Sequence, residues 1–343
     1  DEPFRPDSAP RSAVRPGNDA MSGILVVRPS SLGDVVWALA IAHDVAAARP
    51  GLAVDWLAEE AFTALPAMCG EVRRTVPVAL RRWRRSPLAG ATWREVRAFR
   101  AALRAERYDA ILDLQEQVKG GVIARTAIGT RHGFDRASIR EPVATLFDDV
   151  HHAVPRDLHF ATRCRRLAGA ALGYAADGPP RWRWNLPAAP SCTPSRPYVV
   201  AVHASSRADK RWPADRWRAL LSDAGASGFD VVLPHGTHEE EAESRALASG
   251  LERATVPPRL ALADMAAFLA RAHAVVGVDT GLTHLAAALG TPTLALFTTT
   301  DAALAGAAIA GPHARDLGGR GVPPAIDEVR AALGGILRTA PRC

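Results

Sequence analysis

The chain has 343 residues, of which 48% are hydrophobic and 23% are charged. This composition is typical of soluble globular proteins and excludes a wholly disordered, collagen-like or fibrous chain. The length favours two domains, and the formal net charge of +6 suits nucleic acid, an anionic membrane face or an anionic substrate without choosing among them.

The chain begins with a polar segment. Residues 1–22 mix Pro, Asp, Arg and Ser without an apolar stretch, so we expect a disordered leader and no secretory signal. From residue 23 onward, short β-branched runs alternate with Ala/Leu-rich amphipathic stretches, which is the pattern of βαβ units. We expect strands over Ile24–Arg28, Ala53–Ala58, Thr75–Ala79 and Asp109–Leu114, with a helix over Ala91–Tyr108.

The same alternation appears twice. The prolines between residues 177 and 197 disfavour helix and central strand, so we interpret this segment as a linker. Four further strands are expected after it, over Tyr198–Ala204, Phe229–Pro234, Ala274–Asp279 and Thr293–Phe297. The predicted fold is α/β, with Rossmann-like domains over 23–176 and 198–325 facing each other across a cleft, and a C-terminal helix and tail over 326–343.

Two further features limit the class of protein. The four cysteines lie far apart without a Cys-x-x-Cys spacing, so neither a zinc ribbon nor a disulfide scaffold is predicted, and a reducing cytosol is expected. No segment reaches the about 18 to 20 uninterrupted apolar residues that would span a bilayer.

Ligands of open α/β sheets bind beyond the carboxyl ends of the strands, so the residues that follow each predicted strand are the informative ones. The first strand leads to Asp34 without a G-x-G-x-x-G or a Walker pattern. The Asp34 carboxylate either lies at the rim of the cleft or is an ordinary acid at a helix start.

Three turns of the second domain suggest an anionic ligand. Ser205, Ser206 and Lys210 can bind phosphate oxygens, although a solvated loop explains them about as well. Glu239 stands where nucleotide-binding domains place a ribose-binding acid. The segment Asp279–His284 contains Gly281 and opens a helix, which predicts a diphosphate-binding turn, with an ordinary tight turn as the alternative.

Together these motifs resemble glycosyltransferase family 9, in its heptosyltransferase I group. The resemblance runs from about residue 24 to 337 and rests on five segments: Arg28–Asp34, Asp113–Lys119, Arg140–Pro142, His203–Pro213 and Asp279–His284. It implies a GT-B fold and transfer of L-glycero-D-manno-heptose from ADP-heptose to the first Kdo of Kdo2-lipid A, with inversion, without a metal and without a cofactor. Glu116 and the segment 297–302 depart from the family pattern.

The resemblance also implies residue roles. Asp34 would be the general base and Lys210 would stabilise the leaving ADP. Donor contacts are expected from Ser205, Ser206, Lys210, Glu239, Asp279, Thr280, Gly281 and His284. Acceptor contacts are expected from Ser31, Gly33, Arg81, Arg82, Arg84, Gln115, Lys119 and Arg140, with Trp83 against a sugar or at the lipid headgroups.

The acceptor is a membrane lipid, so the resemblance implies a cytoplasmic protein peripheral on the cytoplasmic face of the inner membrane, held by an anionic surface. A nucleic-acid partner is not expected, because no helix-turn-helix, RRM or zinc-finger signature is present. Two alternatives stay open: heptosyltransferase II or another GT-B nucleotide-sugar transferase, and a non-catalytic module that binds sugar nucleotides or glycolipids.

Overall fold

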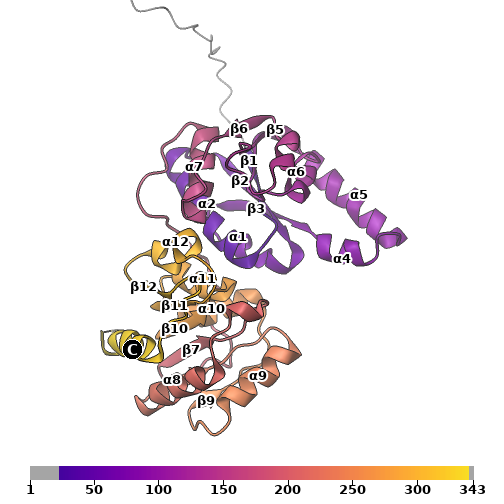
Figure 1. Cartoon of the computed structure of the whole chain (residues 1–343). Coiled ribbons are helices and arrows are strands. Elements are labelled where there is room, and N and C mark those ends of the chain that lie inside the picture. Colours follow the sequence, from indigo (N-terminus) through magenta and orange to yellow (C-terminus); the bar gives the residue numbers. More distant parts are fainter. Residues whose placement is uncertain (1–22, 340–343) are drawn as a thin grey trace, which may run out of the picture.

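The computed structural model describes residues 23–339. They form two six-stranded parallel sheets, one in each half of the chain, each covered by helices (Figure 1). The α/β fold class predicted from the sequence is therefore confirmed. The predicted leader over 1–22 and the last four residues of the C-terminal tail lie outside the described residues.

The first sheet has the strand order β3-β2-β1-β4-β5-β6. Its strands are β1 (Gly23–Val27), β2 (Ala53–Glu59), β3 (Val72–Val78), β4 (Arg107–Asp113), β5 (Ile128–Phe134) and β6 (Val150–His152). Its helices are α1 (Leu32–Ala38), α2 (Ala40–Ala48), α3 (Ala64–Ala67), α4 (Leu80–Arg85), α5 (Gly90–Arg104), α6 (Val118–Ala124) and α7 (Phe160–Leu172).

The second sheet has the strand order β12-β11-β10-β7-β8-β9. Read from β9, this is the same topology as in the first sheet. Its strands are β7 (Tyr198–Val202), β8 (Asp230–Val232), β9 (Ala254–Thr255), β10 (Ala274–Val278), β11 (Thr293–Phe297) and β12 (Ala314–Gly318). Its helices are α8 (Ala214–Ala226), α9 (His238–Ala248), α10 (Leu262–Ala270), α11 (Gly281–Ala288), α12 (Ala302–Ala305) and α13 (Ile326–Thr339).

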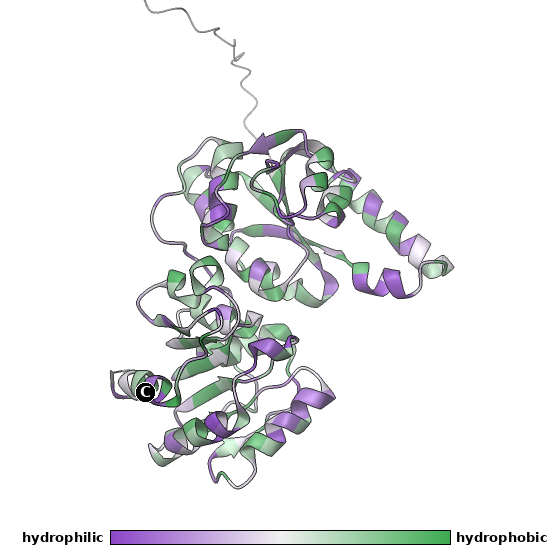
Figure 2. Ribbon diagram, viewed as in Figure 1, coloured by the Kyte–Doolittle hydropathy of each residue, from purple (hydrophilic) through white to green (hydrophobic). Residues whose placement is uncertain are grey.

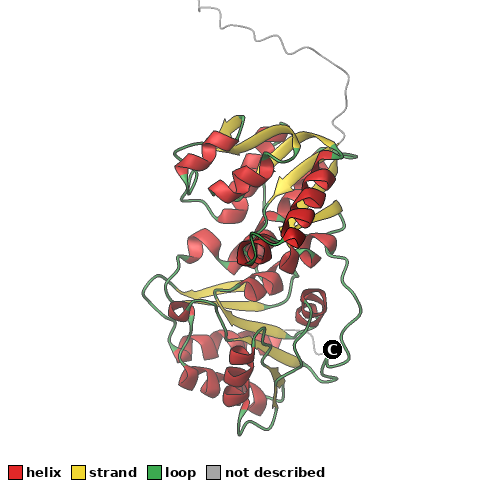
Figure 3. Cartoon of the chain, turned by 90° about the vertical axis from the view of Figure 1, so that its right-hand side faces the viewer, coloured by secondary structure: helices red, strands yellow, loops and turns green. Residues whose placement is uncertain are grey.

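The central strands are buried on both faces. All five residues of β1, β7, β10 and β11 are buried, as expected for parallel strands that helices cover on both sides. Figure 3 shows the strands of each half enclosed by helices. In each sheet the strand order reverses beside a central strand, β1 in the first and β7 in the second, which is where ligands of doubly wound sheets bind.

The structure corrects some predicted elements. The helix expected to reach Tyr108 ends at Arg104, because Tyr108 belongs to β4, where its buried hydroxyl donates to Asp55 Oδ2 at 2.8 Å. The arginine-rich run after β3 forms helix α4. Strands β5, β6, β9 and β12 were not predicted, because they are short, polar or at the sheet edges.

The predicted linker crosses between the two halves as an ordered segment. Trp182 donates to the carbonyl of Val36 at 2.8 Å, and Trp184 donates to the carbonyl of Ala288 at 2.9 Å. Its two tryptophans are thus fixed to helices of different halves. Figure 1 shows α1 and α7 of the first half beside α11 and α12 of the second.

The colouring by hydropathy in Figure 2 places apolar residues along the strands and polar residues on outer helices such as α4 and α9. Among residues 23–339, no helix combines the length and the apolar character that a membrane crossing requires.

Candidate active site

Helices α1 and α11 contact each other at their first turns. A Cβ atom on Gly33 would lie 2.6 Å from Cδ2 of His284, and one on Gly281 would lie 2.9 Å from the backbone nitrogen of Gly33. Both distances are too short for a real Cβ, so this approach requires glycine at both positions. The contact brings the loop after β1 next to the loop after β10.

Asp34 lies in the first turn of α1, beside the second half. Its Oδ2 atom accepts hydrogen bonds from the backbone N–H of Ser31 at 2.9 Å and from the Ser31 hydroxyl at 2.8 Å. Nη2 of the buried Arg28 lies 2.6 Å from the same oxygen. Oδ1 has no hydrogen bond within residues 23–339, and the side chain is 36% exposed, so this oxygen is available to a ligand.

The electrostatics of Asp34 favour the carboxylate. Burial raises its pKa, but the Arg28 guanidinium and the two Ser31 donors outweigh burial and hold the pKa below its usual value. Asp34 is thus both the acid at a helix start and a carboxylate at the boundary between the halves, so the two interpretations of the sequence describe one residue.

Across the boundary, Asp279 organises the second group of polar residues. Its carboxylate accepts from Lys210 Nζ at 2.6 Å and His284 Nε2 at 3.0 Å, and also from the Thr300 hydroxyl. Burial raises the pKa of Asp279, but the bonds to His284 and Lys210 outweigh it and leave the pKa well below its usual value. An ammonium group and the first turn of α11 therefore lie side by side, an arrangement that suits a diphosphate.

Sequence reasoning missed two neighbours of this group. Thr300 belongs to the segment 297–302, whose departure from the family pattern had left it without a predicted role. Trp37 packs its ring 5.0 Å from the His284 ring, centroid to centroid. The only sequence signal for Trp37 was its place in an apolar helix, which predicts core packing and not a site.

The other predicted donor residues lie on turns of the second half. Ser205 is buried, and its hydroxyl accepts from the Arg207 N–H at 3.3 Å, while Ser206 is exposed. His203 is buried and lies 2.8 Å from the Ser244 hydroxyl, so it is a satisfied strand-end histidine.

A cavity of about 340 Å³ lies between the turn after β8 and the turn after β9. Gly236, Thr237 and Glu241 line it, together with residues 256–259. Glu239 is exposed and outside this lining, whereas Glu240 turns back and accepts from the Gly236 N–H at 2.7 Å. The ribose contact expected from Glu239 stays a prediction.

Part of the predicted acceptor set gathers beside Asp34. Gln115 Oε1 lies 3.4 Å from the backbone nitrogen of Ser30, whose hydroxyl lies 3.5 Å from Lys119 Nζ. Burial and three arginines, Arg28 first, lower the pKa of Lys119. Arg140 is exposed on a separate loop. The loop after β1 and the start of α6 therefore form one polar surface.

The arginines of α4 are used unevenly. Arg82 binds Glu60 and Glu95, with nitrogen to oxygen distances of 3.0 and 2.8 Å. The Arg81 guanidinium lies over the Phe62 ring at 5.2 Å. Trp83 packs on Phe99 and donates to Glu95 at 2.8 Å. Trp83 is half-buried in this arrangement, and its contact with a sugar or with lipid headgroups stays a prediction.

Glu116, one of the departures from the family pattern, is a buried acid. It is buried with a left-handed backbone (φ 59°) and pairs with Arg163 at 2.5 Å. Nearby, burial and the Asp148 carboxylate raise the pKa of Asp113 to about 8, and burial raises the pKa of Asp148 to about 6. The departure at Glu116 thus lies in a buried ion pair with Arg163.

A metal site requires several ligand side chains grouped around one point. In the part of the chain that the structure describes, no three or more His, Cys, Asp or Glu side chains are grouped so that they could hold a metal ion.

Comparisons with known proteins connect this geometry to a family. The profile of glycosyltransferase family 9 (heptosyltransferase) matches residues 96–312. Lipopolysaccharide heptosyltransferase 1 of Escherichia coli K12 is 38% identical over 291 residues, covering 82% of this chain and 90% of that protein. The protein of the same name from Pseudomonas aeruginosa is 40% identical over 289 residues, covering 83% and 81%.

Solved structures agree with the sequence matches. The E. coli heptosyltransferase WaaC with ADP superimposes with a TM-score of 0.82 at 34% identity, covering 93% of this chain and all of that chain. The same enzyme with ADP-2-deoxy-2-fluoro heptose gives a TM-score of 0.80, covering 92% of this chain and 99% of that chain. These relatives show the same two-sheet architecture over nearly the whole described chain.

Proposed function

This chain belongs to glycosyltransferase family 9, the heptosyltransferases, and on that premise we propose that it transfers L-glycero-D-manno-heptose from ADP-heptose to the first Kdo of Kdo2-lipid A in lipopolysaccharide inner-core synthesis. Heptosyl transfer in that synthesis follows from the family and from the close relatives. The identity of the acceptor, the stereochemistry, the independence from metal and the membrane contact are the finer parts of the proposal.

One observation supports the chemistry above all others. The free oxygen of Asp34 and the Lys210–Asp279 pair approach the same boundary from opposite halves, joined by the contact of α1 with α11. A transferase needs a base on the acceptor side and positive charge on the donor side. Asp34 in α1 and Lys210 in the turn after β7 would supply these two groups from different halves.

Asp34 would act as the general base. A sugar hydroxyl is a weak nucleophile near neutral pH, and removing its proton as the new bond forms contributes typically ~10²- to 10⁴-fold. The low pKa of Asp34 keeps it ionised at neutral pH, and Oδ1 can accept the proton while Oδ2 stays bound to Ser31 and Arg28. The hydroxyl would attack the anomeric carbon opposite the leaving ADP, and this single displacement inverts the configuration.

Lys210 and the first turn of α11 would stabilise the leaving group. ADP gains negative charge as the glycosidic bond breaks, and an ammonium with backbone N–H groups at a helix N-terminus supplies the opposite charge. Thr280 makes no side-chain cap on this helix, which leaves its first N–H groups free for phosphate oxygens. We propose that these groups serve where other transferases use a metal, so that no cofactor is needed.

The acceptor carries carboxylates and phosphates, and the polar surface beside Asp34 is cationic. Lys119 contacts Ser30, and the charges of Arg81 and Arg84 are close enough to act on it. Guanidinium groups bind carboxylate and phosphate bidentately. We propose that this surface holds the Kdo residues while the protein is peripheral on the cytoplasmic face of the inner membrane.

The decisive test compares Asp34→Asn with Asp215→Asn. Both replace a carboxylate in the first turn of a helix, but Asp215 is exposed on α8 of the second half. Asp34→Asn should lower kcat for heptose transfer at least ~10²-fold with little change in the Kd for ADP. Asp215→Asn should keep wild-type values. Normal turnover of Asp34→Asn would refute the assignment of the base.

A second measurement separates the alternatives. Transfer to Kdo2-lipid A should exceed transfer to its monoheptosylated product, and the reverse preference would indicate heptosyltransferase II. Binding of ADP-heptose without turnover on either acceptor would indicate a binding module.

A further inference from the structure

Residues 80–104 form an arm on the first half of the molecule. Helix α4, a short loop and helix α5 extend together away from the sheet (Figure 1). The inner side of α5 is apolar: Leu103 is fully buried, and Phe99 packs edge-on against Trp83 with ring centroids 5.6 Å apart. The arm is therefore a folded part of the first half and presents a fixed outer side.

The outer side of the arm exposes large apolar side chains at its tip. Leu88, in the loop between the helices, is 91% exposed, and Trp93, in the first turn of α5, is 56% exposed. Trp93 shares one helix face with Arg97, Arg100 and Arg104, which follow it at helical spacing. An apolar tip and a cationic face therefore adjoin each other.

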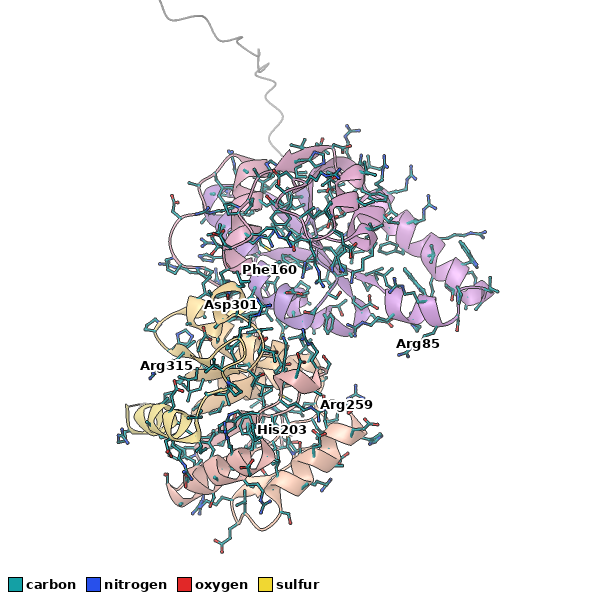
Figure 4. The ribbon with its side chains drawn as sticks, in the orientation of Figure 1. Arg85, Phe160, His203, Arg259, Asp301 and Arg315 are labelled. Atoms are coloured by element: carbon teal, nitrogen blue, oxygen red, sulfur yellow. The ribbon has the colours of Figure 1, made fainter. Side chains whose placement is uncertain are left out.

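The charges of the arm are strongly one-sided. Its 25 residues contain eight arginines and one acid, Glu95. Arg82 uses Glu60 and Glu95. Five of the other arginines make no hydrogen bond and no ion pair within residues 23–339: Arg84, Arg85, Arg97, Arg100 and Arg104. Figure 4 shows Arg85 at the outer part of the arm, away from the body of the protein.

We propose that the tip of this arm inserts Leu88 and Trp93 into the surface of an anionic lipid bilayer, with the arginines of α5 lying over the headgroups. Tryptophan with leucine prefers the boundary between headgroups and acyl chains, and arginine pairs with lipid phosphates. Nucleic acid would use the same charges but offers no apolar layer for Leu88. A bilayer matches both halves of the surface.

This inference rests on the proposed function for its purpose and not for its evidence. Arg84, at the end of α4, is near enough to Lys119 for its charge to lower the pKa of that residue. The arm therefore adjoins the surface proposed for the acceptor. An arm fixed to the bilayer would hold that surface toward a lipid-linked sugar.

The test measures binding of the full chain to vesicles of phosphatidylethanolamine and phosphatidylglycerol, with phosphatidylcholine vesicles for comparison. One variant removes the tip (Leu88→Ser with Trp93→Ser), and a second removes charge (Arg97→Gln with Arg100→Gln). The matched control changes an exposed apolar residue and two arginines on the second half: Val322→Ser, Arg315→Gln and Arg320→Gln.

The wild type and the control should bind anionic vesicles at least ~10-fold more tightly than phosphatidylcholine vesicles. Each arginine near an anionic surface contributes a factor of about five, so the double arginine variant should lose about 25-fold. The tip variant should lose about 10-fold or more. Lipids brominated in their acyl chains should quench fluorescence of the wild type more than that of Trp93→Phe.

Two outcomes would overturn the proposal: vesicle binding by both arm variants equal to that of the control, or quenching equal in the wild type and Trp93→Phe. Arm-dependent binding of RNA without vesicle binding would assign the face to nucleic acid. Turnover on a deacylated, water-soluble Kdo acceptor separates this inference from the proposed function. Arm variants should keep that turnover, whereas failure of the wild type to transfer heptose would refute the proposed function and leave the vesicle result standing.

Discussion

The contact between α1 and α11 can be tested by adding one methyl group. In Gly281→Ala, the new Cβ would lie 2.3 Å from Leu32 Cδ2, 2.8 Å from Leu32 Cβ and 2.9 Å from the backbone nitrogen of Gly33. The Leu32 Cδ2 methyl can turn away, but Leu32 Cβ and the Gly33 nitrogen are fixed by the backbone. Restoring ordinary 3.4 Å contacts to both fixed atoms requires a movement of about 0.6 Å between the two halves.

The size of the effect follows from that movement. Overpacking of this kind costs typically ~1–3 kcal/mol of stability. A misplacement of about 1 Å can lower turnover ~10²-fold, so half of that movement should lower kcat for heptose transfer about 10-fold. The Kd for ADP should change less than about threefold, because the N–H groups of α11 remain in place.

The assays are chemical denaturation, heptose transfer and calorimetry of ADP binding. Gly319→Ala is the control, since a Cβ there meets nothing within 4 Å. The double variant Gly281→Ala with Leu32→Ala should recover only part of the loss, because the contacts with Cβ of residue 32 and with the backbone of Gly33 remain. Wild-type stability and kcat in Gly281→Ala would refute the close approach, and full recovery in the double variant would assign the clash to the leucine alone.

Three further predictions follow from the polar groups. Because the pKa of Asp113 is raised to about 8, its stabilising protonated form is lost as pH rises from about 4 to 8, and the free energy of unfolding should fall by on the order of 4 kcal/mol over that range. Asp113→Asn should flatten this dependence in denaturation series at pH 5 to 8.5. Arg28→Met should move the acid limb of the kcat/KM profile to higher pH, because the Arg28 guanidinium lowers the pKa of Asp34. Arg28→Lys should keep most of the wild-type profile, and identical profiles for the wild type and both variants would contradict this account. Glu239→Ala should weaken ADP binding by about 1.5–3 kcal/mol in calorimetry, because its carboxylate is predicted to accept from the ribose. Unchanged affinity in Glu239→Ala together with a loss in Glu240→Ala would move the contact to Glu240, which binds the Gly236 N–H.

Much of the fold could be predicted from local sequence, because buried parallel strands are continuous apolar runs with abrupt ends. The strand predicted over Thr293–Phe297 is found with those bounds, and the strand over Tyr198–Ala204 is two residues shorter. Edge strands such as β6 and β9 have two or three residues and little apolar pattern, so no sequence signal separates them from loops. Where one element follows another directly, as α5 and β4 do, propensity misplaces the boundary by a few residues.

The sequence by itself determined the chemistry available to this protein: a carboxylate after the first strand, a lysine after the seventh and the Asp279 motif after the tenth. Those residues follow strand ends, and the parallel topology brings the carboxyl ends of strands to one edge of each sheet.

Tertiary structure alone decided how those groups are used. Lys210 and Thr300 meet on Asp279 although 69 and 21 residues separate them from it in the chain. Trp83 is half-buried because α5 folds back beside it and places Phe99 and Glu95 against its ring. Contacts between distant segments depend on which faces pack together, and local sequence does not encode that choice. The approach of Asp34 to the donor turn is the clearest case, because it depends on two glycines in different halves that become neighbours only when the chain is folded.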